Sequence, residues 1–151
     1  MSYNFRPYDQ DQIHLLPESL DDWVSEDSFA RFLSEVVDHL WDNGKLKSFC
    51  EARNKSGKGG AAFHPALMLK LLLFCYCQGV MSSRKIAQGV RCNVELRYLT
   101  ANQLPRYRAI AEFRKQHLDG IQKLFVDVLV LCQEAGLAKV GKVALDGRRV
   151  Q

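Results

Sequence analysis

The segment FHPALMLKLLLFCYCQGVMSSRKIA, residues 63–87, holds the most apolar stretch of the sequence, followed by a turn. His64-Pro65 predicts the start of a helix, because proline is favoured at the first helical position. Residues 66–76 are apolar nearly all round, which is typical of the central helix of a bundle. Gln78-Gly79-Val80-Met81 then predicts a short break.

A second helix is predicted after this break, over residues 84–90, with Ser82 or Ser83 as its cap. Helix, glycine-containing turn and helix form the outline of a helix-turn-helix. Arg84 and Lys85 lie in the first turn, where the helix macrodipole disfavours cations by about a few tenths of a kcal/mol. Basic side chains are favoured there when phosphate groups lie outside the helix.

Helical periodicity continues on both sides of this segment. Before it, apolar residues recur at helical spacing at Phe29, Phe32, Leu33, Val36, Val37, Leu40 and Trp41. We expect Ser25 or Asp27 to cap this helix and Gly44 to end it, with a short helix at 46–53. Further helices are expected at 94–99, 109–117 and 118–135. The last has an apolar stripe at Leu118, Ile121, Leu124, Phe125, Val128, Leu129 and Cys132, and Gly136 closes it.

The sequence therefore predicts a mainly α fold, a helical bundle with a helix-turn-helix-like segment. Residues 1–24 show no periodicity and are expected to form an extended lead-in, and residues 25–137 the helical domain. Residues 139–145, KVGKVAL, predict one C-terminal β-strand. Because a lone strand is not stable, residues 138–151 are expected to begin a second domain that is missing from this sequence.

Composition excludes several classes of protein. Of 151 residues, 47% are hydrophobic and 25% charged, which is ordinary for a globular protein and excludes disorder throughout. The longest mostly apolar run, residues 66–80, is too short to span a membrane, and residues 1–10 resemble no signal peptide. We expect no membrane partner and a cytoplasmic location. The five cysteines form no CxxC pair, which argues against a disulfide framework or a zinc site.

Charge is unevenly distributed, although the net charge is only +4. Residues 1–43 contain ten acidic and two basic residues, whereas residues 84–115 contain eight basic and two acidic ones. The eight are Arg84, Lys85, Arg91, Arg97, Arg106, Arg108, Arg114 and Lys115. A basic middle suits one face of the molecule to a polyanion. Charge alone is equally compatible with ordinary solvated helix surface.

These eight residues are the candidate DNA-binding residues. Tyr107 lies between two arginines, and basic residues interleaved with an aromatic one are suited to DNA backbone contact. The edge of a surface helix would have the same pattern. We expect most of the eight to contact phosphates and two or three to reach base edges. Residues 84–90 and 108–117 both qualify as the helix that enters the major groove.

Four strings together resemble bacterial insertion-sequence transposases with an InsH-like N-terminal domain and a ribonuclease-H-like DDE catalytic domain. They are FRPYDQDQIHLLPESLDDWV (5–24), FHPALMLKLLLFCYCQGVMSSRKIA (63–87), RAIAEFRKQH (108–117) and VALDG (143–147). The resemblance rests on the order and spacing of the set. It implies a helical N-terminal domain that binds the double-stranded terminal inverted repeats of a transposon, helps assemble protomers and is nucleoid-associated.

The resemblance also implies a catalytic domain entered through the strand at residues 143–145. Asp146 would then be a catalytic, metal-binding residue, the first of three carboxylates that hold two Mg²⁺ ions about 4 Å apart. Local sequence favours a turn at Asp146-Gly147. The sequence departs from the family pattern at Arg148-Arg149. It also lacks the other two carboxylates of the family.

One carboxylate cannot position two Mg²⁺ ions, so we expect this chain alone to lack nuclease and strand-transfer activity and to bind no cofactor. Two other functions stay open. The chain could be a truncated regulator that occupies transposon ends. It could also be a dimerisation or protein-interaction module, built on the acidic helix at 28–42 and the long helix at 118–135.

Overall fold

The computed structural model describes residues 4–7, 9–11, 13, 19–51 and 63–136. Within these residues the chain forms eight helices and no strand, which confirms a mainly α fold. The helices are α1 (Leu20–Trp23), α2 (Phe29–Asp42), α3 (Ser48–Glu51), α4 (Pro65–Cys77), α5 (Ser83–Cys92), α6 (Val94–Leu99), α7 (Tyr107–Gln116) and α8 (Leu118–Glu134). The strand expected at 139–145 lies outside the described residues.

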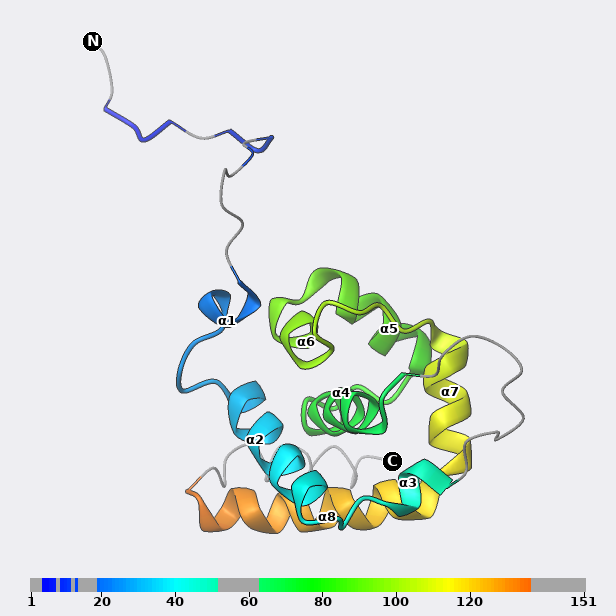
Figure 1. Cartoon of the computed structure of the whole chain (residues 1–151). Coiled ribbons are helices and arrows are strands. Elements are labelled where there is room, and N and C mark those ends of the chain that lie inside the picture. Colours follow the sequence, from blue (N-terminus) through cyan, green and yellow to red (C-terminus); the bar gives the residue numbers. More distant parts are fainter. Residues whose placement is uncertain (1–3, 8, 12, 14–18, 52–62, 137–151) are drawn as a thin grey trace.

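Helix α4 is the centre of the bundle, as its composition predicts. Every residue from Ala66 to Cys77 except Lys70 is buried. Helices α2, α5, α6 and α8 all contact α4, and Figure 1 shows them arranged around it. A helix that is apolar on all sides requires neighbours on all sides, because any uncovered face would expose apolar surface to water.

His64 caps α4, and Pro65 is the first residue of the helix, as predicted. The His64 Nδ1 atom accepts a hydrogen bond from the Ala66 amide at 3.1 Å. Its ring also packs against Trp41 of α2, with 4.4 Å between the ring centroids. The cap and the packing contact together place the start of α4 against the end of α2.

The cap of α2 is Ser28, which corrects the prediction of Ser25 or Asp27. The Ser28 hydroxyl accepts a hydrogen bond from the Ala30 amide at 3.1 Å and donates one to Glu95 Oε2 at 2.7 Å. Glu95 lies in α6, so a partner distant in sequence contributes to the choice of this serine. Gly44, with φ of +74°, follows the end of α2 as predicted, because glycine adopts this backbone conformation most readily.

The lead-in is less extended than predicted. Residues 20–23 form the single-turn helix α1, which begins with a capping box between Ser19 and Asp22. The sequence pattern of serine followed three residues later by an acid is the local signal for this turn. Helix α1 packs beside α6.

Helix α8 covers one side of the bundle with the predicted stripe, apart from its first member. Ile121, Leu124 and the following stripe residues are buried, but Leu118 is 47% exposed. At this end of the helix His117 makes the packing contacts instead, and its ring lies 5.1 Å from Phe49 and 4.7 Å from Phe113. No helix in the described part of the chain is long and apolar enough to cross a membrane.

Candidate nucleic-acid interface

Helix α5 has one buried face and one exposed polar face. Ser83, Ile86 and Val90 point into the bundle and are buried. The exposed residues are Arg84, Lys85, Gln88, Arg91 and Cys92. Positions 84, 88 and 91 share one side of the helix because the helical repeat is 3.6 residues. The exposed face of α5 therefore carries three cations and no acid.

Helix α7 crosses the first turn of α5. Near its start, the Tyr107 ring lies 4.3 Å from the Arg84 guanidinium carbon. Near its end, Arg114 donates hydrogen bonds to the Met81 carbonyl and the Ser83 hydroxyl. Ile110, between these two points on the same side of α7, is fully buried. Contacts from both ends of α7 therefore hold the start of α5 in place.

Tyr107 brings two arginines from different helices to one ring. In addition to Arg84, the guanidinium carbon of Arg108 lies 5.9 Å from the ring centroid. The Arg108 Nε atom is 3.4 Å from the Tyr107 hydroxyl oxygen and donates a long hydrogen bond to it. Cations are attracted to the face of an aromatic ring. Tyr107 thus holds two exposed positive charges near each other despite their mutual repulsion.

Arg97 and Arg114 differ from the other predicted residues, because their guanidinium groups donate hydrogen bonds to backbone carbonyls. Arg97 donates from Nε to the Val90 carbonyl at 2.9 Å and from Nη2 to the Arg91 carbonyl at 3.3 Å. Its Nη1 donates to Asn102 Oδ1 at 2.6 Å. Arg97 thus satisfies carbonyl groups at the end of α5, which have no partner within the helix.

The remaining predicted residues are exposed. Arg106 precedes α7, Arg91 lies in the last turn of α5 and Lys115 in the last turn of α7. Within the described residues the ion pairs are Arg31–Asp21 and Lys70–Asp38, so none involves the eight candidates. Their positive charge is therefore not neutralised by a direct carboxylate partner in that part of the chain.

Sequence reasoning missed two features of this surface. It did not select Gln88, the uncharged polar residue between Arg84 and Arg91 on the exposed side of α5. It also did not separate Arg114 from the exposed cations, although helical spacing contains the signal. Arg114 follows Tyr107 and Ile110 at offsets of seven and four, so it belongs to the packed side of α7.

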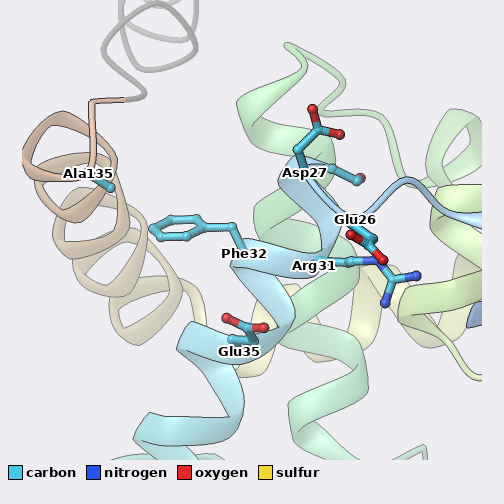
Figure 2. Close-up of a pocket in the computed structure, with 7 residues that line it drawn as sticks. Glu26, Asp27, Arg31, Phe32, Glu35 and Ala135 are labelled. Atoms are coloured by element: carbon cyan, nitrogen blue, oxygen red, sulfur yellow. The ribbon is translucent and has the colours of Figure 1, made fainter.

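A pocket of about 290 Å³ lies between the start of α2 and the C-terminal end of α8. Figure 2 shows Glu26, Asp27 and Glu35 along the α2 side, with Phe32 directed toward Ala135. The Ser25 hydroxyl and the backbone amide of Asp27 itself hydrogen-bond its carboxylate and lower its pKa. Arg31 also lines the pocket, but it is paired with Asp21. Three carboxylates repel phosphate, so this pocket is not part of the candidate nucleic-acid interface.

The proposed catalytic residue, Asp146, lies outside the described residues. Within the described part, no group of three or more His, Cys, Asp or Glu side chains is arranged to hold a metal ion. Mg²⁺ requires several oxygen ligands in near-octahedral geometry. The described residues do not fit a Mg²⁺ site, and we assign no catalytic step to them.

Comparison with known families identifies the relationship of the chain. Residues 18–116 match the model of the family described as Transposase domain (DUF772). No curated protein and no solved structure matches the chain. The matched region extends from α1 to α7 and includes all eight candidate DNA-binding residues. The match covers about two thirds of the length of the chain, so the chain belongs to the DUF772 transposase-domain family.

Proposed function

We propose that this chain is the DNA-binding region of an insertion-sequence transposase and binds the terminal inverted repeats of a transposon. The family relationship supports a role in transposition. One observation carries the DNA-binding part of the proposal. Five exposed cations without a carboxylate partner in the described part gather on α5 and at the start of α7, namely Arg84, Lys85, Arg91, Arg106 and Arg108.

The eight basic residues have two roles in this proposal. The exposed ones, Lys115 included, contact the DNA, mostly through phosphate oxygens. Arg97 and Arg114 are positioning residues, because their donors are already bound to the Val90 and Met81 carbonyls and to other groups of the chain. They orient α5 rather than contact the nucleic acid.

Fluorescence-anisotropy titration with a transposon-end duplex and a scrambled duplex tests the proposal. Titrations at about 50 and 200 mM salt count the phosphate contacts, since each contact releases counterions. We expect tighter binding to the transposon end and a steep loss of affinity with salt. Equal binding to both duplexes would reduce the surface to a general polyanion site. Absence of binding at low salt would overturn the proposal.

A charge-matched pair of variants locates the surface. The test variant replaces Arg84, Lys85 and Arg91 by glutamine. The control variant replaces three exposed lysines outside this surface by glutamine, namely Lys45, Lys47 and Lys123. Both lose the same net charge. The test variant is expected to lower the salt slope by roughly one unit for each phosphate contact removed, while the control keeps the slope. An equal effect of both variants would mean that binding follows net charge and not this surface.

Self-association is the second candidate function. Val126 and Val130 are one turn apart on α8, and they are 48% and 47% exposed. Apolar side chains at neighbouring exposed positions favour contact with another protein surface. Sedimentation velocity with and without DNA tests self-association. A dimer that is lost when both valines are changed to lysine supports this role. A monomer in both conditions contradicts it.

A further inference from the structure

We infer that α5 is the helix that enters the major groove and that Gln88 on it recognises an adenine. This inference rests on the proposed DNA-binding function and adds the residue that determines sequence preference. The exposed faces of α5 and α7 differ in one respect that decides between them. The exposed face of α5 contains no acid, whereas that of α7 contains Glu112.

Glu112 lies in the middle of the outer face of α7. Arg108, Glu112 and Lys115 are spaced at offsets of four and three, so they share one side of the helix. The Gln116 side-chain amide donates a long hydrogen bond of 3.5 Å to the Glu112 carboxylate. The phosphate backbones on both sides of a groove disfavour a carboxylate at this central position unless a cytosine N4 donor lies opposite it. Helix α7 therefore suits the rim of the interface better than the floor of the groove.

The exposed face of α5 has cations near both ends. Arg84 and Arg91 are seven residues apart, which corresponds to roughly 10 Å along the helix axis. The major groove admits one α-helix, and long arginine side chains at both ends of that helix can reach backbone phosphates beside it. Gln88 is midway between them on the same side and is exposed.

The groups around α5 hold it in a defined position. Tyr107 contacts Arg84 at the start of the helix, and Arg97 binds the Val90 carbonyl at its end. A base contact requires such support, because a helix free to rotate would not present one side chain to one base edge. The amide of glutamine can both accept from adenine N6 and donate to adenine N7.

The test measures binding of the wild-type chain and Gln88→Ala to a transposon-end duplex in which each base pair is replaced in turn. We expect wild type to lose roughly tenfold in affinity when one particular A·T pair is replaced, within the range of a single bidentate base contact. Gln88→Ala should bind the native duplex roughly tenfold more weakly and show no penalty at that pair. Its salt slope should remain unchanged, since Gln88 carries no charge.

Gln116→Ala is the matched control, because it removes the same side-chain amide from the exposed part of α7. It should retain every base preference. A gain-of-function variant, Gln88→Lys, should shift the preference at that pair from adenine to guanine, whose O6 and N7 both accept hydrogen bonds.

The outcomes separate this inference from the proposed function. If wild type does not distinguish the transposon end from a scrambled duplex, the proposed recognition of transposon ends fails and the inference with it. If wild type distinguishes them but Gln88→Ala keeps every base preference, only the inference is overturned. If Gln116→Ala changes the preference, α7 is the helix in the groove.

Discussion

The guanidinium carbon of Arg84 lies 4.3 Å from the centroid of the Tyr107 ring, and this contact joins the first turn of α5 to the first turn of α7. It orders an arginine that would otherwise extend into solvent in many rotamers. An ordered arginine loses less conformational entropy when it binds a phosphate. The ring also offsets part of the repulsion between Arg84 and Arg108.

Replacing Tyr107 by leucine is expected to weaken DNA binding by roughly two- to fivefold, the value of an exposed cation–π contact. Tyr107→Phe should bind nearly as well as wild type, because it keeps the ring and loses only the long hydrogen bond to Arg108. Anisotropy titration measures both, with circular dichroism to verify folding. If the two variants bind equally weakly, the hydroxyl and not the ring is the important group.

Arg97→Met is expected to lower the free energy of unfolding by roughly 1 to 3 kcal/mol, because it leaves carbonyl groups at the end of α5 without a donor. Urea denaturation measures this change. The salt slope of DNA binding by the folded variant should equal that of wild type. A stable variant whose slope falls by about one unit would identify Arg97 as a phosphate contact instead.

Lys70 of α4 pairs with Asp38 of α2 at 2.7 Å, and its side chain is only 15% exposed. The two partners are predicted to respond differently to substitution. Asp38→Ala should destabilise the fold by about 1 kcal/mol, since it removes the partner of a largely buried lysine side chain, while exposure of Asp38 limits the loss. Lys70→Met should be neutral or stabilising. Thermal denaturation compares them, and a larger loss for Lys70→Met would contradict the prediction.

The buried thiols predict a loss of stability at alkaline pH. Burial raises the pKa of Cys75 and Cys77 from 9.0 to about 12. Above pH 9.0 the unfolded chain releases these protons while the folded chain keeps them. The free energy of unfolding must therefore fall as pH rises from about 9 toward 12. Urea titrations of wild type and a Cys75→Ala/Cys77→Ala variant test this, since the variant should lose less stability over that range.

Two of the five cysteines allow a footprint of the proposed DNA-binding surface. Cys92 lies on the exposed side of α5 and Cys50 in α3, and both thiols are exposed, whereas the other three are buried. A thiol reagent should label Cys50 and Cys92 rapidly in the free protein. Bound DNA is expected to protect Cys92 and leave Cys50 reactive. Equal protection of both thiols would place the DNA elsewhere or indicate a change of the whole fold.

The positions of most helices could be predicted from the sequence, because the signals that define them are local. The spacing of apolar residues, the His64-Pro65 pair and Gly44 each determine structure only within one or two helical turns of their own position. The same reasoning applies to α6, whose limits at Val94–Leu99 agree with the prediction. The all-apolar α4 also predicts its own central position, since only complete coverage removes its surface from water.

The choice among residues of one chemical type needed the tertiary structure. Ser28 caps α2, and Glu95 from a distant helix contributes to this choice by accepting a hydrogen bond from its hydroxyl. Arg97 and Arg84 are alike in sequence terms, yet Arg97 binds backbone carbonyls, whereas Arg84 packs on the Tyr107 ring and stays exposed. A guanidinium group has five donors and a long, flexible stem, so its role depends on which acceptors the folded chain brings within reach. Local sequence specifies the helices, whereas contacts between helices decide which arginines remain available to an external ligand.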